Sequence, residues 1–377
     1  MTFATKYFAT LEKEAMPSFD TSDSSARIEN FFRSNGIELT VNAVEHGPVV
    51  TKYVSTLGKD TDHLAHVEKL RRDLGLRLGV GASKVFIGES SWNGGVYLAI
   101  EVPNAKRIAV PATSVIPVPE GDAFKNGLRV CLGVDTSGVP FTIDLSTAPH
   151  MLVAGQSGSG KSVFLNSLIC GLLDNYEPFE CLVAIIDPKG TEFTDFNGIK
   201  HLTLGPGFDE IGKVGRSEDA VHLLNYLTEV MNSRMAEFNK VRVSNLKQYN
   251  ALGRDTMPYI VAIIDEFYDL LMNYPEAGEP LSILAAKARS SGIHLVLATQ
   301  RPSVDVIKGA LKANLSTRIA LKVSSRTDSQ VIIDQPGAES LCGRGDMLYV
   351  GPDGDVPRRL HGCMVSTEQI RALASVL

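Results

Sequence analysis

The stretch that decides the fold of this chain is Gly155-Gln156-Ser157-Gly158-Ser159-Gly160-Lys161-Ser162. It fits the pattern G-x-x-x-x-G-K-S, whose glycines let successive backbone N–H groups converge on phosphate groups. A buried-strand pattern precedes it at Met151–Ala154, and a helical pattern follows at Ser162–Leu173. Strand, loop and helix are the context that the pattern requires, so we predict a nucleotide-binding loop at the N-terminus of a helix.

Each part of this loop has a predicted role toward ATP. Lys161 reaches the β- and γ-phosphates, and the Ser162 hydroxyl ligates Mg²⁺. The residues predicted to contact the nucleotide are Gly155, Gln156, Ser157, Gly158, Ser159, Gly160, Lys161, Ser162 and Val163.

Two carboxylates follow a second apolar strand, Tyr259–Ile264. Ligands of open α/β sheets bind at the carboxyl ends of the strands, where Asp265 and Glu266 stand. We predict that Asp265 holds Mg²⁺ through water and that Glu266 accepts a proton from the attacking water. A carboxylate beside the metal ligand favours hydrolysis over phosphoryl transfer to another acceptor.

Two further residues flank the next predicted strand, Ile293–Thr299. The Gln300 amide, directly after it, is placed to sense the γ-phosphate. Arg289, before it, ends a helical stretch, where a positive charge is favourable against the helix dipole. An arginine supplied across a subunit interface would instead stabilise charge in the transition state, and both interpretations of Arg289 remain open here.

The pattern of strands and helices predicts an α/β fold with a mostly parallel sheet covered on both faces. Its five apolar runs are 151–154, 182–186, 259–264, 294–298 and 318–323. A smaller α+β pattern precedes them, with a helical spacing of apolar residues over 64–78. The predicted division is a polar arm (1–26), a small domain (27–115), a hinge (116–128) and an ATPase domain (129–377).

Composition excludes several classes of protein. The chain has 377 residues, of which 44% are hydrophobic and 21% charged, as in ordinary globular proteins of two or three domains. Its longest apolar runs are strand-sized, so no membrane segment and no signal peptide are expected. The five cysteines include no C-x-x-C pair, which argues against a disulfide framework or zinc site and favours the cytoplasm.

Charge is distributed unevenly along the chain. The net charge is −6, which argues against a protein that coats nucleic acid indiscriminately. Between Arg301 and Ser329, however, six basic residues stand against two acidic ones. This basic cluster is either a solvated surface or a local contact with nucleic acid.

Taken together, these motifs resemble the motor of the FtsK/SpoIIIE family of DNA translocases, within the HerA–FtsK group. The similarity extends over roughly residues 28–365. A nucleotide loop alone is shared by many families, whereas the run 288–307 is far more specific. The matching strings are Pro149–Val163, Ile186–Lys189, Ile264–Phe267, Ala288–Ile307, Lys312–Asn314, Ser324–Arg326, Asp334–Gln335, Gly337–Glu339 and Gly345–Leu348.

The resemblance implies a RecA-like P-loop motor core preceded by a smaller α domain. It also implies a ring of six subunits around double-stranded DNA, with ATP bound between neighbours. By motif, Arg289 then resembles an arginine finger that acts on the next subunit's ATP. Arg301, Lys312 and Arg326 resemble the pore residues that touch DNA phosphates, which agrees with the basic cluster.

Two features depart from the family pattern, and several functions stay open. Septal anchoring and a C-terminal winged helix are not expected, because the chain has no membrane spans and ends soon after residue 348. The segment 191–215 differs from the family string. Besides a DNA translocase, the alternatives are a conjugative coupling ATPase, a protein-secretion ATPase of the same superfamily and a nucleotide-gated binding module.

Overall fold

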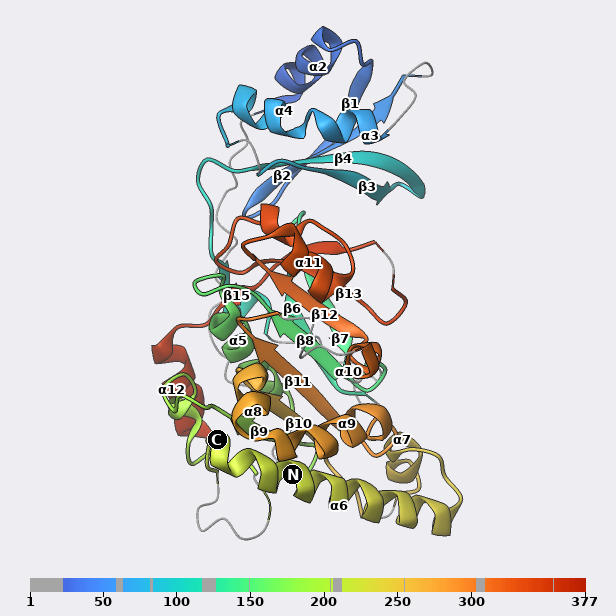
Figure 1. The fold of residues 1–377 in the computed structure, drawn as a ribbon, viewed down its shortest axis with the longest axis vertical. Coiled ribbons are helices and arrows are strands. Elements are labelled where there is room, and N and C mark those ends of the chain that lie inside the picture. Colours follow the sequence, from blue (N-terminus) through green and yellow to red (C-terminus); the bar gives the residue numbers. More distant parts are fainter. Residues whose placement is uncertain are drawn as a thin grey trace.

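The structure is a computed structural model of the whole chain. The residues it describes are 23–58, 64–81, 84–116, 127–148, 150–203, 205, 212–253, 255–302, 309–354 and 356–377. The predicted arm lies outside them up to residue 22, and the predicted hinge from 117 to 126. The molecule is elongated, with a small sheet at one end and a large sheet through the rest (Figure 1). None of the helices in the described ranges is both long and apolar enough to cross a bilayer.

The small sheet is antiparallel, and its described strands follow the order β1-β2-β4-β3. Alternate strand residues such as Tyr53 and Ile100 pack with Phe32 and Leu74 of the covering helices into a separate core. The elements are α2 (Ser25–Ser34), β1 (Leu39–His46), β2 (Val50–Leu57), α3 (Leu64–Lys69), α4 (Arg71–Leu78), β3 (Phe86–Trp92) and β4 (Gly95–Pro103).

The single helix predicted over 64–78 is wrong, because the structure has two helices there, α3 and α4. Leu70 N–H donates to the carbonyl of Val67, three residues back, at 3.1 Å. A three-residue bond tightens the turn and interrupts the α-helical ladder at Leu70. The apolar spacing continues through the break, which is why periodicity alone did not reveal it.

The large sheet contains the five predicted strands, and they pair in parallel as predicted. Across the described residues its order is β7-β6-β14-β13-β12-β8-β11-β10-β9. The parallel strands are β8 (His150–Ala154), β9 (Cys181–Ile186), β10 (Tyr259–Ile264), β11 (Ile293–Thr299) and β12 (Thr317–Leu321). Their carboxyl ends share one edge of the sheet, so the loop after β8 and the carboxylates after β10 meet there.

Antiparallel strands extend this sheet beyond β12, and the sequence did not predict them. Their pairing is antiparallel throughout, so the complete sheet is mixed. They are β6 (Arg129–Asp135), β7 (Pro140–Asp144), β13 (Asp346–Val350) and β14 (Arg358–His361). A short parallel pair lies beside them, formed by β5 (Val110–Pro111) and β15 (Cys363–Met364).

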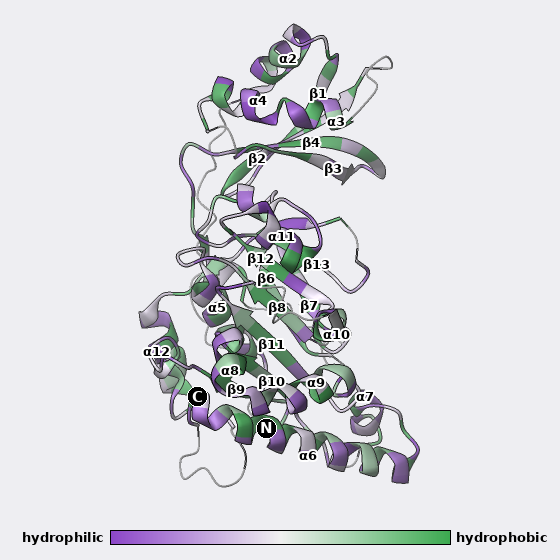
Figure 2. Ribbon diagram, viewed as in Figure 1, coloured by the Kyte–Doolittle hydropathy of each residue, from purple (hydrophilic) through white to green (hydrophobic). Residues whose placement is uncertain are grey.

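Side-chain alternation along the strands divides the interior into two cores. Met151 and Val153 of β8 face the core under α5 and α12, whereas Leu152 and Ala154 face the core under α6, α8 and α9. Figure 2 shows hydrophobic residues running through these central strands, which are buried on both sides. The helices are α5 (Lys161–Asn175), α6 (Ser217–Val241), α7 (Leu246–Asn250), α8 (Phe267–Asn273), α9 (Gly278–Lys287), α10 (Gly309–Asn314), α11 (Arg326–Ile333) and α12 (Thr367–Val376).

The segment after β9 folds back along the outer edge of that strand. Val183 N–H donates to His201 O at 2.8 Å, and Thr203 N–H donates to Val183 O at 2.9 Å. Further along, Gly215 N–H donates to Ile185 O at 2.8 Å. Backbone groups of β9 that point away from β10 are therefore bonded within the chain.

The small and large sheets touch through polar side chains. Arg359 of β14 donates from Nη1 to Glu101 of β4 at 2.8 Å, and both residues are buried. Ser137, in the turn between β6 and β7, donates to Glu45 of β1 at 2.7 Å. The units are thus joined by direct contacts as well as by the chain between them.

Candidate nucleotide site

The predicted nucleotide loop follows β8 and is held by the strands on both sides of it. Gly155 N–H donates to Thr299 O at 3.3 Å, and Gln156 N–H donates to Lys322 O at 2.9 Å. Ser157 and Gly158 at the tip are exposed. Gly158 and Gly160 have φ values of +74° and +106°, which side chains rarely permit, so glycine is favoured at both positions. We call residues 155–162 the cradle.

A second loop packs against the base of the cradle. Gly345 N–H donates to Ser159 O at 2.9 Å. A Cβ atom on Gly160 would lie 2.5 Å from the nitrogen of Gly345, which is too close for a real contact. This nitrogen is a backbone atom, so it cannot move aside as the end of a flexible side chain could. Gly160 is therefore required both by its φ value and by this close approach.

Gly160→Ala is expected to lower the free energy of unfolding by about 1–3 kcal/mol, because it forces a strained φ and a backbone clash. Gly171 offers a matched control in the interior of α5, where an added Cβ meets nothing within 4 Å. Gly171→Ala should stabilise by about 0.5–1 kcal/mol. Urea denaturation of both variants measures the difference, and equal shifts would contradict the packing described here.

The Lys161 ammonium joins the cradle to the two predicted carboxylates. It is bonded to Asp265 Oδ1, and it donates to Glu266 Oε1 at 2.9 Å. The side chains of all three residues are almost fully buried. Burial raises the pKa of the Asp265 carboxyl, an effect that the nearby Lys161 ammonium opposes. The structure thus brings together the three residues that sequence reasoning placed at the site.

Glu266 is fixed more tightly than a surface carboxylate would be. Besides its bond to Lys161, its Oε2 accepts from the backbone N–H of Gln300 at 3.0 Å. Its own backbone is left-handed, with φ 45° and ψ 44°, at the turn between β10 and α8. A non-glycine residue in this region costs about 1–3 kcal/mol, and such strain clusters at functional sites. The strained turn directs the Glu266 carboxylate toward the end of β11.

Gln300 contributes through its backbone, which the sequence could not show. The side-chain amide was predicted to sense the γ-phosphate, and the structure leaves that side chain half-buried at the same edge. The bond that joins Gln300 to the site comes from its backbone N–H.

The residues predicted to hold a magnesium ion carry oxygen atoms and stand at the start of α5 and the end of β10. Ser162 is half-buried in the first turn of α5, and Asp265 is adjacent to the same Lys161 ammonium. Mg²⁺ prefers such hard oxygen donors and usually takes only one or two protein ligands, with waters and phosphate oxygens completing its shell. Val163, the next helical residue, is 40% exposed, so the first turn of α5 is open to a phosphate.

Arg289 lies at the amino ends of the parallel strands, opposite to the carboxyl ends where the cradle stands. It follows α9 and precedes β11, and its side chain is exposed. The cradle stands at the far end of β11, whose seven residues at about 3.3 Å each span roughly 20 Å. An arginine side chain does not bridge that distance, so Arg289 does not reach the cradle of its own subunit.

The predicted DNA contacts divide into exposed and paired side chains. Arg301, just after β11, and Arg326, at the start of α11, are exposed. Lys312 donates to Asp334 at 2.6 Å, and the same carboxylate binds Arg318, which keeps the pKa of Asp334 below its usual value. Part of the positive charge of the basic cluster is therefore neutralised within the chain. The two remaining basic residues of the cluster are Lys308 and Lys322. Of these, Lys308 lies outside the described residues.

Known protein families match this sequence along most of its length. The FtsK/SpoIIIE family model matches residues 122–257 and 253–304, and the FtsK alpha domain model matches residues 9–104. A protein of Haemophilus influenzae named DNA translocase FtsK is 38% identical over 383 residues, which cover 93% of this chain and 70% of that protein. The chain belongs to the FtsK/SpoIIIE family. The resemblance seen in the motifs is thereby confirmed.

Other FtsK relatives are longer than this chain. The DNA translocase FtsK of Pseudomonas syringae pv. tomato is 37% identical over 362 residues, covering 89% of this chain and 44% of that protein. That of Caldanaerobacter subterraneus subsp. tengcongensis is 38% identical over 375 residues, covering 98% and 51%. The chain therefore spans about half the length of several curated relatives that it matches.

Solved structures confirm the predicted fold class of this FtsK/SpoIIIE chain. The conjugation coupling protein TcpA, in a monomer form with ATPgS, superposes with a TM-score of 0.58 at 20% identity, covering 93% of this chain and 99% of that one. The cytoplasmic domain of the type VII secretion ATPase EccC from Thermomonospora curvata gives 0.57 at 25% identity, covering 69% and 31%. The α/β fold with a RecA-like P-loop core is the architecture they share.

Sequence reasoning missed the polar network that links the cradle region to the small sheet. Asp346, next to Gly345, is fully buried and receives two bonds from Arg359, at 2.9 and 2.7 Å. Arg359 also binds Glu101 of the small sheet. Burial opposes ionisation of Asp346, but the Arg359 guanidinium holds the pKa of this carboxyl far below its usual value. The string Gly345–Leu348 marked the place, but its partner Arg359 has no motif around it.

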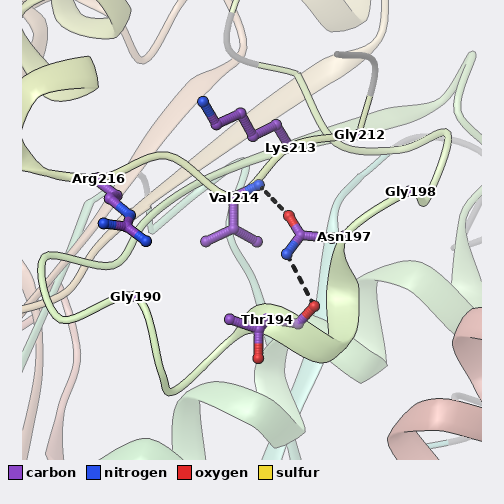
Figure 3. Close-up of a pocket in the computed structure, with 8 residues that line it drawn as sticks. All are labelled: Gly190, Thr194, Asn197, Gly198, Gly212, Lys213, Val214 and Arg216. Carbon is purple, nitrogen blue, oxygen red and sulfur yellow. Dashed lines mark hydrogen bonds between the residues drawn. The ribbon is translucent and has the colours of Figure 1, made fainter.

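A pocket of about 450 Å³ lies in the connection between β9 and α6, and it includes no residue of the cradle (Figure 3). Its wall is tied by Asn197, which accepts from Val214 N–H at 2.8 Å and donates to Thr194 O at 3.0 Å. This is the segment that departs from the family string. The residues lining it are Gly190, Thr194, Asn197, Gly198, Gly212, Lys213, Val214 and Arg216.

Proposed function

We propose that this chain is an ATP-driven motor that moves along double-stranded DNA. The observation that carries the proposal is the group at the cradle, in which the buried Lys161 ammonium joins Asp265 and Glu266. Positioned charges of this kind are what phosphoryl transfer requires. We propose DNA as the polymer that is moved because curated relatives in the family are named DNA translocases.

Each residue of the cradle has a role in hydrolysis. Backbone N–H groups of the glycine-rich loop bind the phosphates, and Lys161 moves to the β- and γ-phosphates when ATP binds. Ser162 and Asp265 would hold a magnesium ion, which would supply positive charge against the phosphate oxygens. Glu266 accepts the proton of the attacking water. Its Oε2 stays aligned by Gln300 N–H, and its Oε1 is released when Lys161 moves to the phosphates.

Hydrolysis then depends on a neighbouring subunit. Strand β11, about 20 Å long, separates Arg289 from the cradle of the same chain, so we assign this arginine no role toward the ATP of its own subunit. In a head-to-tail ring, Arg289 of one subunit faces the ATP of the next and stabilises charge in the transition state. We propose a ring of six, the number that the family resemblance implies, with duplex DNA in the centre.

Domain roles and location follow from the same proposal. We assign residues 27–115 to the small domain, 116–128 to the hinge and 129–377 to the motor domain.

The proposed location is the cytoplasm. All five cysteines are free, which suits this reducing compartment, where ATP is also supplied.

DNA contact is assigned to Arg301, Lys312 and Arg326. Arg301 and Arg326 are exposed and reach phosphates without rearrangement. Lys312 must first exchange its bond with Asp334, so we expect it to contribute less. Phosphate contacts carry little base information, as a motor that moves along any sequence requires.

Arg326→Ala is expected to lower the slope of log affinity against log salt by about one unit, because one phosphate contact is lost. Lys312→Ala should change the slope less. Lys240, 70% exposed on α6, supplies the control: Lys240→Ala should leave the slope unchanged. Fluorescence anisotropy with a labelled duplex at several salt concentrations gives the slopes, and an unchanged slope for Arg326→Ala would remove this residue from the DNA surface.

The proposed function is tested by ATP turnover with and without long linear duplex DNA, combined with triplex displacement. Strong stimulation together with displacement supports a translocating motor. Stimulation without displacement would indicate a DNA clamp. Turnover that ignores DNA would instead favour a protein-handling ATPase.

A further inference from the structure

The loop that carries Arg289 has all of its backbone carbonyls bonded. Within Ala288–Gly292, the carbonyl of Ala288 accepts from Ile293 N–H at 3.2 Å, and that of Arg289 from Gly292 N–H at 3.1 Å. The carbonyl of Gly292 accepts from Ile260 N–H of β10 at 2.9 Å. These bonds lie within the loop or in the sheet. We call residues 288–292 the arginine loop.

The two remaining carbonyls of the arginine loop are bound from outside the sheet. Leu246 N–H, at the start of α7, donates to Ser290 O at 2.9 Å. Arg234 of the long helix α6 donates from Nη1 to Ser291 O at 2.7 Å. Helices α6 and α9 pack against each other, and α6 runs along the lower end of the molecule in Figure 1. Through Arg234, α6 is bonded directly to the arginine loop.

Arg234 is a charged residue buried in an apolar environment. It is 7% exposed, among the apolar residues Leu227, Met231 and Phe238 on the inner face of α6. In the described part of the chain, no carboxylate forms an ion pair with it. Burial lowers the pKa of its guanidinium to about 10. A buried charge without an anionic partner is costly, so a residue that only fills space would be apolar.

We propose that Arg234 is a positioning residue for catalysis in the neighbouring subunit: its bond to Ser291 O sets where Arg289, two residues earlier, projects from the subunit. The proposal rests on the proposed role of Arg289 across the subunit interface. Arg289 itself is exposed, so no packing around its side chain fixes its direction. The anchored backbone must do so, and a misplacement of about 1 Å at a reacting centre can cost 100-fold in rate.

Two substitutions separate the hydrogen bond from the bulk of the side chain. Arg234→Met keeps an unbranched chain but removes every donor, and we expect the turnover number of the assembled protein to fall up to about 100-fold. The affinity for ATP should not change, because the cradle is at the other edge. Arg234→Lys keeps a donor for the single bond to Ser291 O, so turnover should stay within about threefold.

Mixed assemblies show whether Arg234 acts on the neighbour. An Arg234→Met subunit has an intact cradle, and a Lys161→Ala subunit has an intact arginine loop. Mixed in the presence of ATP and linear duplex DNA, they should turn over more ATP than either variant alone. A defect confined to the folding of the Arg234→Met subunit would not be repaired by the partner.

The same experiment with Arg289→Ala and Lys161→Ala is the reference. If that pair shows no recovery, the proposed action of Arg289 across the interface fails, whatever Arg234 does. If it recovers but the Arg234→Met pair does not, the positioning role is overturned. Full turnover of Arg234→Met alone, or weakened ATP binding, would overturn it as well. Should Arg234→Met fail to fold, loss of turnover in a folded Arg234→Lys decides against the role.

Discussion

Arg289→Ala is expected to lower ATP turnover of the assembled protein by at least about 10³-fold, the effect typical of an arginine that stabilises a transferring phosphoryl group. The side chain lies on the edge of the sheet opposite to the cradle, so its loss leaves the nucleotide pocket of the same subunit intact. ATP affinity and subunit assembly should therefore be preserved. Steady-state turnover at saturating ATP and DNA, with assembly checked by sedimentation, measures the effect.

Lys287 provides the matched control for this change. It is also exposed, carries the same charge and ends α9 two residues before Arg289. Lys287→Ala should leave turnover within a few-fold of the unsubstituted protein. If both variants lost activity equally, the result would indicate a general electrostatic effect at this edge, and full activity of Arg289→Ala would contradict its proposed role.

Glu266→Gln is expected to reduce ATP turnover by about 10³-fold while ATP still binds, because an amide does not accept the proton of the attacking water. Glutamine keeps the shape of the side chain, and its carbonyl oxygen can still accept from Gln300 N–H as Glu266 does at 3.0 Å. The change therefore removes the base with little disturbance of the strained turn. Single-turnover hydrolysis and titration with a fluorescent ATP analogue measure the two quantities separately.

Glu276→Gln makes the same chemical change on an exposed residue of the same region, and turnover should be unaffected. If Glu266→Gln hydrolysed ATP at a normal rate, another group would have to be the base. If it lost ATP binding as well, Glu266 would be needed for the shape of the cradle, and its assignment as a base would lose support.

The parts of this protein that could be predicted from its sequence are those with a local signal. Buried parallel strands are continuous apolar runs, so β10 was located to the residue at 259–264. The glycine pattern placed the cradle, and position after a strand placed Asp265 and Glu266. Their meeting with Lys161 followed because parallel strands end at one edge of the sheet.

The parts that could not be predicted depend on contacts between distant segments. The strands β6, β7, β13 and β14 belong to the sheet through their pairing partners, and nothing local shows that β14 pairs with β6, more than 200 positions earlier in the chain. The bond from Gln300 is made by its backbone, which has no sequence signature. Arg234 belongs to none of the motifs that the sequence analysis singled out, and only the structure shows that it is buried and bonded to the arginine loop.

The folded-back segment along β9 has a consequence for the behaviour of the protein at high concentration. An unpaired border of a sheet is a template on which another polypeptide can add a strand, and aggregation often begins there. Here His201, Thr203 and Gly215 occupy backbone groups of Val183 and Ile185 that would otherwise serve as that template. This side of the molecule therefore offers other copies no open strand on which to pair and aggregate, even at high protein concentration.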